Sequence, residues 1–267
     1  MTSTAGAAVA AGTAALEAAG CDTPRLDAEL LVADAIGVDR AALVADPRRE
    51  LAPEVAQAAS ERLERRAARE PVAYILGRRG FRRLELAVDR RVLIPRPETE
   101  LLVELALGLA PRAARVHDVG TGSGAICLAL KQERPDLVVS ASDASEAALE
   151  VAALNRERLG LDVELIVHGG LPRGPFDLVV ANLPYVGLDE WPHLAPELRD
   201  FEPHEAFLAG PDGLSVIPSL VREAPSGMLL GLEHGATQGP AVRALLREAE
   251  THRDLAGHER VTVGRAP

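Results

Sequence analysis

Short hydrophobic runs rich in β-branched residues alternate with helical stretches through the second half of the chain. Buried parallel strands have this pattern, so it predicts an α/β fold with a doubly wound parallel sheet. The predicted strands are residues 115–119, 137–142, 163–167, 176–181 and 228–233. A helix around Ala241–Glu250 and a last short strand, Arg260–Val263, complete the predicted elements.

The first part of the chain has helical periodicity instead. Thr23, which is followed by a proline, predicts the N-cap of a helix, and Gly37 predicts its end. A second helical segment, residues 55–69, has a charged face that includes Arg66 and that we interpret as solvated. We therefore predict a small helical bundle over residues 1–72.

Residues 73–98 are predicted to form a connecting β-hairpin. The alternation in Leu84-Glu-Leu-Ala-Val88 favours a short strand, and Pro95 and Pro97 end the segment. The remaining residues, 99–267, contain the predicted sheet. The chain is thus expected to have a helical domain, a hairpin linker and an α/β domain.

Composition limits the classes to which the chain can belong. Of its 267 residues, 47% are hydrophobic, which suffices for one ordinary domain and a smaller one. Apolar runs stay below the roughly 18 residues that a membrane span needs, and residues 1–20 lack a signal-peptide pattern. Cys21 and Cys127 favour neither a disulfide framework nor a metal site. We expect a soluble, cytoplasmic, monomeric protein without a metal.

A glycine-rich loop joins the first predicted strand to a helix. Its glycines stand at alternate positions, which lets the backbone turn tightly and approach a ligand. Asp143 ends the second predicted strand about twenty residues downstream, where a carboxylate can accept hydrogen bonds from both hydroxyls of a ribose. These features predict a nucleoside cofactor bound by Gly120, Thr121, Gly122, Ser123, Gly124 and Asp143.

The glycine loop alone does not distinguish a dinucleotide from S-adenosylmethionine. Gly120, Gly122 and Ala125 also satisfy the dinucleotide pattern G-x-G-x-x-G/A. A dinucleotide would place its pyrophosphate at the helix N-terminus, whereas S-adenosylmethionine has a carboxylate and an ammonium there. Asp118 could be the partner of that ammonium. The residues at the end of the fourth strand are needed to distinguish a dinucleotide from S-adenosylmethionine.

The fourth predicted strand ends in the tetrapeptide Asn182-Leu-Pro-Tyr185, at the edge where such sheets bind ligands. An amide nitrogen is a poor nucleophile because its lone pair is delocalised, so a catalyst has to hold both N–H hydrogens and aim the nitrogen. The Asn182 side-chain oxygen can accept one hydrogen and the Leu183 carbonyl the other, while Tyr185 covers the planar group. This favours methyl transfer to an amide over a simple turn cap.

At these residues the chain resembles the HemK/PrmC family of peptide chain release factor N5-glutamine methyltransferases, whose signature is Asn-Pro-Pro-Tyr after the fourth strand. Leu183 replaces the first proline of that signature, and His168-Gly-Gly170 replaces a usually acidic position. The similarity covers nearly the whole chain. It includes Arg25-Leu-Asp-Ala-Glu-Leu-Leu, Tyr74-Ile-Leu-Gly-Arg-Arg, Ile94-Pro-Arg-Pro-Glu-Thr-Glu100, Phe201-Glu-Pro203, Glu233-His-Gly235 and Glu259-Arg-Val-Thr-Val-Gly-Arg265.

The resemblance implies a class I, Rossmann-like S-adenosylmethionine-dependent methyltransferase sheet. Its substrate would be the glutamine in the Gly-Gly-Gln motif of class I release factors, and its helical N-terminal domain would bind the release factor. Asn182 and Tyr185 would be catalytic, and Gly170 and Asn182 would join the glycine loop and Asp143 in binding the cofactor. The substrate amide would be bound by Asn182, Leu183, Pro184 and Tyr185.

Two other functions remain compatible with the residues. An adenine-N6 nucleic-acid methyltransferase would present a similar planar amine to the tetrapeptide, although the net charge of −11 disfavours binding to a phosphate backbone and favours a protein partner. A binding module that has lost catalysis would also explain the departures at Leu183 and Gly169-Gly170. A dehydrogenase is a more distant alternative.

Overall fold

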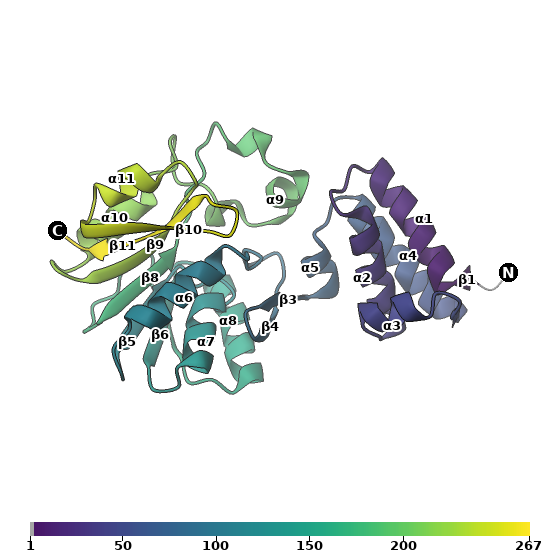
Figure 1. Ribbon diagram of the computed structural model, residues 1–267, viewed down its shortest axis with the longest axis horizontal. Coiled ribbons are helices and arrows are strands. Elements are labelled where there is room, and N and C mark those ends of the chain that lie inside the picture. The colour runs from purple at the N-terminus through teal and green to yellow at the C-terminus, as the bar shows by residue number, and fades with distance from the viewer. Residues whose placement is uncertain (1–2) are drawn as a thin grey trace. The chain divides into compact units, whose positions relative to one another are not determined.

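The computed structural model describes residues 3–267 and divides them into two compact units (Figure 1). The first unit contains the residues up to Gly77 and the short helix α9 (Pro196–Phe201). The second contains Arg78–Ala195 and Glu202–Pro267. Of the segment predicted as a hairpin, residues 78–98 therefore belong with the sheet, whereas residues 73–77 belong to the first unit and are helical up to Leu76. Among residues 3–267, no helix has the length and apolar character that crossing a membrane requires.

The first unit is helical, as predicted. Thr23 begins a helix, but its side chain does not cap it, because its hydroxyl donates to the Asp27 carboxylate at 2.7 Å. Gly37 ends this helix in the left-handed conformation, with φ of 77°. The elements are β1 (Ser3–Thr4), α1 (Ala5–Ala18), α2 (Pro24–Ile36), α3 (Arg40–Ala45), β2 (Glu50–Leu51), α4 (Pro53–Ala67) and α5 (Val72–Leu76).

One charge of the α4 face is buried, contrary to the prediction of a solvated face. Arg66 is 5% exposed and donates to Asp27 at 2.7 Å and to Glu197 of α9 at 2.8 Å. Arg69 donates to the same Glu197 carboxylate at 2.6 Å. A buried guanidinium needs such partners, so these ion pairs hold α9 in the first unit.

The second unit is built on a seven-stranded sheet with the order β10-β11-β9-β8-β5-β6-β7. The five strands from β9 to β7 in this order are parallel and confirm the predicted ones, with small shifts of their ends. The strand order reverses between β5 and β8, which is where doubly wound sheets bind ligands. The strands are β5 (Arg115–Val119), β6 (Val138–Asp143), β7 (Glu164–Val167), β8 (Leu178–Asn182), β9 (Leu229–Glu233), β10 (Arg247–Arg253) and β11 (Glu259–Arg265).

The helix predicted around Ala241–Glu250 is wrong over its second half. The helix α11 ends at Arg243, and β10 begins at Arg247 and pairs antiparallel with β11. Glu248 has φ of 51°, which a helix does not allow. Backbone hydrogen bonds to β11 therefore override the helical propensity of this segment.

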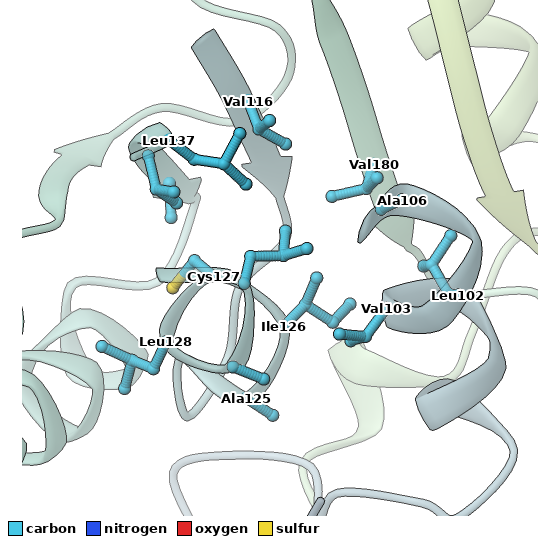
Figure 2. Packing of buried hydrophobic residues seen from close by; sticks show 14 of the residues in the cluster. Leu102, Val103, Ala106, Val116, Ala125, Ile126, Cys127, Leu128, Leu137 and Val180 are labelled. Carbon is cyan, nitrogen blue, oxygen red and sulfur yellow. The ribbon is translucent and has the colours of Figure 1, made fainter. Parts of the chain in front are cut away.

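Helices cover both faces of the sheet (Figure 1). The alternating residues of β8 show the division: Leu178 and Val180 join the core under α6 and α7, whereas Val179 and Ala181 join the core under α10 and α11. Figure 2 shows Val180 facing the first of these helix pairs. The remaining elements are β3 (Arg78–Phe81), β4 (Leu84–Ala87), α6 (Thr99–Leu109), α7 (Ala125–Glu133), α8 (Glu146–Leu159), the 3-10 turns η1 (Trp191–His193) and η2 (His204–Ala206), α10 (Val216–Glu223) and α11 (Gly239–Arg243).

Candidate active site

The glycine loop between β5 and α7 needs glycine at three positions. Gly120, Gly122 and Gly124 have φ of 75°, 56° and 83°, a region that side chains with a Cβ rarely adopt. A Cβ on Gly122 would meet nothing within 4 Å, because this residue faces a cavity. The loop thus offers bare backbone to a ligand.

Asp143, at the end of β6, fixes the glycine loop from the neighbouring strand. Its Oδ2 accepts the Gly122 N–H at 2.9 Å and its Oδ1 accepts the Ser145 N–H at 2.9 Å. Each carboxylate oxygen can accept more than one hydrogen bond. Asp143 therefore still has acceptor capacity toward the cavity that it lines.

Asp118 does not face the cavity, contrary to the expectation that it could be the partner of a ligand ammonium. It is fully buried, and its Oδ2 accepts the Thr121 hydroxyl at 2.6 Å and the Cys127 N–H at 3.3 Å. Burial raises the pKa of Asp118 to about 7, although these two hydrogen bonds lower it. The Asp118 carboxyl therefore stabilises the glycine loop from its buried side through these two hydrogen bonds.

A cavity of about 240 Å³ lies at the carboxyl ends of the strands and contains six of the predicted site residues in its lining: Gly120, Gly122, Asp143, Asn182, Leu183 and Pro184. Apolar side chains such as Leu93, Ala148 and Val216 form most of the remaining wall, and Arg91, Ser145, His168 and Glu205 also line it. A cavity with an apolar wall and a few fixed polar groups suits a nucleoside.

Other predicted cofactor residues lie outside this lining. Thr121 and Ser123 are buried within the loop, and Gly124 caps α7. Gly170 packs against Glu223, which accepts the N–H of Leu171 at 2.9 Å. His168 and Gly169, the two residues before Gly170, line the cavity instead.

The tetrapeptide at the end of β8 borders this cavity and a second, smaller one. A pocket of about 30 Å³ is lined by Asn182, Tyr185, Leu93 and Arg96, among others, so Asn182 borders both cavities. Tyr185 is held by its carbonyl, which accepts from Gln238 at 2.9 Å, and burial raises the pKa of its hydroxyl to about 12. At neutral pH the phenol is uncharged.

Leu183 packs against the glycine loop. It is 8% exposed, and its Cδ2 atom lies 2.8 Å from the position that a Cβ on Gly120 would take. The departure from the family signature is therefore accommodated by a close contact between the tetrapeptide and the loop.

Three further residues hold the site and were not singled out individually from the sequence. Asn182 donates through Nδ2 to the Thr99 hydroxyl at 3.0 Å, and Asn182 pairs in register with Glu233 on β9. Asn155 of α8 donates to the Ser123 carbonyl of the glycine loop at 2.9 Å. Thr99 and Glu233 belong to motifs that support the family resemblance, but spacing alone gave them no role.

The residues present fit a nucleoside cofactor of the predicted kind. Gly122 leaves an open approach to the backbone, the carboxylate of Asp143 retains acceptor capacity for ribose hydroxyls, and the wall beside them is apolar. The strand order and the position of the cavity define a class I methyltransferase fold.

Comparison with known proteins gives the family. The PrmC N-terminal domain matches residues 7–77 and the methyltransferase small domain matches residues 97–193. A release factor glutamine methyltransferase from Caulobacter vibrioides is 42% identical over 93% of this chain and 92% of its own. A protein of the same name from Pseudomonas aeruginosa is 45% identical over 91% of this chain and 94% of its own. The chain belongs to the release factor glutamine methyltransferase family.

The fold is also found in a solved structure of lower similarity. A methyltransferase from Pyrococcus furiosus has a TM-score of 0.50 and 17% identity, and the match covers 76% of this chain and 96% of that one. At this identity the match shows the fold alone.

Proposed function

We propose that this protein transfers a methyl group from S-adenosylmethionine to the side-chain amide nitrogen of the glutamine in the Gly-Gly-Gln motif of class I release factors. The observation that carries this proposal is the position of Asn182, which borders both the larger cavity and the small pocket beside Tyr185. An amide held by Asn182 in the small pocket would therefore lie beside the cavity proposed for the cofactor.

When bound, S-adenosylmethionine supplies an activated methyl group on a sulfonium. Gly120, Gly122 and Asp143 would hold it, with Thr121, Ser123 and Gly124 shaping the loop and His168 and Gly169 lining the same cavity. The polar backbone of the loop would face the methionine part, and the Asp143 carboxylate would accept hydrogen bonds from the ribose.

The tetrapeptide binds and orients the substrate amide. The Asn182 Oδ1 and the Leu183 carbonyl accept its two hydrogens, and Pro184 and Tyr185 pack on its plane. The amide nitrogen held there would take the methyl group from the sulfonium, which would leave as a neutral thioether, and the surplus amide proton would leave to water. No group of unusual basicity is required, because the methyl donor is already cationic.

The proposal extends to the binding partner of the enzyme and to where it acts. Residues 1–72 bind the release factor, and the net charge of −11 suits a protein partner better than direct contact with nucleic acid. The enzyme acts as a monomer in the cytoplasm, where release factors work, and needs neither a metal nor a membrane.

Mass spectrometry of a release factor incubated with the enzyme and cofactor tests the proposal. One added methyl on the Gly-Gly-Gln glutamine is expected, and none on a release factor whose glutamine is replaced by alanine. Asn182→Ala is the matched enzyme control. Methylation of adenine in DNA or RNA instead of the release factor would overturn the proposal.

A further inference from the structure

Three polar side chains from three separate segments meet at the end of β8. The Asn182 Nδ2 donates to the Thr99 hydroxyl at 3.0 Å. The Glu233 carboxyl is close enough to Thr99 for the hydroxyl to lower its pKa. Asn182 and Glu233 are direct partners in the register of β8 and β9, so their side chains point to the same face of the sheet. Only Asn182 has a part in the proposed function.

Close packing of α6 on the sheet brings these residues together. A Cβ on Gly231 of β9 would lie 3.1 Å from Leu102 of α6, so the absence of a side chain at Gly231 allows the helix to approach. Leu102 lies one turn after Thr99, the first residue of α6. Thr99 is 4% exposed and Glu233 is 1% exposed, which makes the cluster a buried polar network.

The hydrogens of this network determine which way the Asn182 amide faces. A hydroxyl has one hydrogen, and an ionised carboxylate only accepts. When Thr99 gives its hydrogen to Glu233, its oxygen can only accept from Asn182. The NH₂ end of the amide must then point at Thr99, and Oδ1 is left for the substrate. A reversed amide would set NH₂ against the NH₂ of the substrate.

We infer that Thr99 and Glu233 are positioning residues that hold the Asn182 carboxamide with its oxygen toward the substrate nitrogen. This inference rests on the proposed function and deepens it. Glu233 supports the assignment independently, because its buried Oε2 has no hydrogen-bond partner among the described residues. An unsatisfied buried oxygen costs stability, and such a group beside a reactive amide points to a function.

The charge state of Glu233 depends on groups from several elements. Burial raises the pKa of Glu233 to about 7. Arg260 of β11 and Arg96 of the segment before α6 face it and lower the pKa, whereas Glu98 at the start of α6 raises it. Tyr185, after β8, also faces it and is uncharged at neutral pH. When Glu233 is protonated, it can donate to Thr99, whose hydrogen is then free to turn the Asn182 amide around.

The first test compares Thr99→Val with Thr99→Ser. Valine keeps the shape of threonine but loses the hydroxyl, so kcat for release-factor methylation should fall about tenfold, as expected for one lost hydrogen bond. Serine keeps the hydroxyl and should restore most of kcat. Thr251→Val, which removes a half-buried hydroxyl from β10 outside the site, should leave kcat within about twofold.

A binding measurement separates positioning from general stability. The wild-type protein should bind a release factor with Gly-Gly-Gln more tightly than one with Gly-Gly-Glu, because Oδ1 repels a carboxylate. In Thr99→Val the amide can turn and donate to that carboxylate, so the preference should fall by about tenfold. Thr99→Ser and Thr251→Val should keep the wild-type preference. A loss of folding alone would reduce both affinities and leave their ratio unchanged.

The pH profile tests Glu233. Wild-type kcat should fall as the pH is lowered from 8 to 6, and Glu233→Gln should flatten this limb because it removes the titrating group. The inference is overturned if Thr99→Val keeps both the wild-type kcat and the wild-type preference for Gly-Gly-Gln over Gly-Gly-Glu. It is also overturned if kcat of Glu233→Gln falls between pH 8 and 6 as in the wild type. If Thr99→Val fails to fold, Thr99→Ala and Glu233→Gln provide the same two readouts. If the wild-type enzyme methylates no release factor, the proposed function has failed instead.

Discussion

The two halves of the site are held in different ways. The glycine loop is shaped mainly by its own backbone, with three glycines at positive φ, and the side chains of Asp143 and Asn155 brace it from neighbouring elements. The amide end of β8 is held by side chains from α6 and β9, which are far from Asn182 in the sequence. A backbone-built half is specified locally and can be recognised as a motif. A half built from side chains depends on how distant segments pack.

Removing Asn182 should give the largest effect, in the half that side chains build. Asn182→Ala should lower kcat by about a hundredfold or more, because a fixed dipole aimed at the reacting amide is lost. Cofactor affinity, measured by calorimetry, should change by less than about tenfold. An Asn182→Ala enzyme with normal kcat would show that the amide is held elsewhere.

Removing Asp143 should instead affect the cofactor half. Asp143→Ala loses hydrogen bonds to the ribose and to the Gly122 N–H, so the Kd for S-adenosylmethionine should rise about thirtyfold, as for a charged hydrogen bond of about 2 kcal/mol. The kcat at saturating cofactor should stay within a few-fold of wild type. Asp143→Asn keeps one acceptor and should have an intermediate Kd. Equal loss of kcat in Asp143→Ala would mean that the two halves are not separable.

Two substitutions in the glycine loop should lower the free energy of unfolding by different amounts. Gly122→Ala places a Cβ in open space, so only its positive φ counts, at about 1 kcal/mol of unfolding free energy. Gly120→Ala adds a close contact with Leu183 and should cost about 2 kcal/mol. Denaturant unfolding measures both. Adding Leu183→Ala should recover part of the loss in Gly120→Ala and none in Gly122→Ala.

The smallest effect is a pH dependence of stability caused by Asp118. Its pKa is raised from 3.8 to about 7 by burial, so the folded state binds more protons than the unfolded chain between these values. Stability from this group is highest below the lower pKa and is lost as the pH rises through the higher one. Between pH 6 and 8 the loss is on the order of 1 kcal/mol. Thermal unfolding of Asp118→Asn should show a shallower decline over this range, and an identical decline would contradict the assigned pKa.

The sequence predicted those features that local chemistry specifies. The five parallel strands, the glycine loop, Asp143 at the end of β6 and the position of Asn182 all follow from runs, spacings and turn residues. The helix predicted near residue 245 failed because pairing with β11 outweighs helical propensity. A tertiary interaction of this kind leaves no local signal.

Tertiary packing also explains why the role of Asp118 was misjudged and why Thr99 and Glu233 were not recognised from the sequence. Asp118 was considered as a partner for a ligand ammonium because of its charge, but the tight loop turns its carboxyl inward to Thr121. Thr99 and Glu233 lie in conspicuous motifs, yet only the approach of α6 over Gly231 brings them to Asn182. Their meeting depends on packing that pattern analysis does not describe.

The ion pairs of α9 have a practical consequence for anyone who wishes to dissect this protein. The backbone leaves the helical unit at Gly77, returns for Pro196–Phe201 and leaves again. A truncation at Gly77 would deprive Arg66 and Arg69 of the Glu197 carboxylate. Arg66 would keep its ion pair with Asp27, so the loss of stability is smaller than the cost of about 3–5 kcal/mol for leaving a buried charge without any partner. A recombinant fragment meant to isolate the helical domain should therefore carry α9 on a grafted linker.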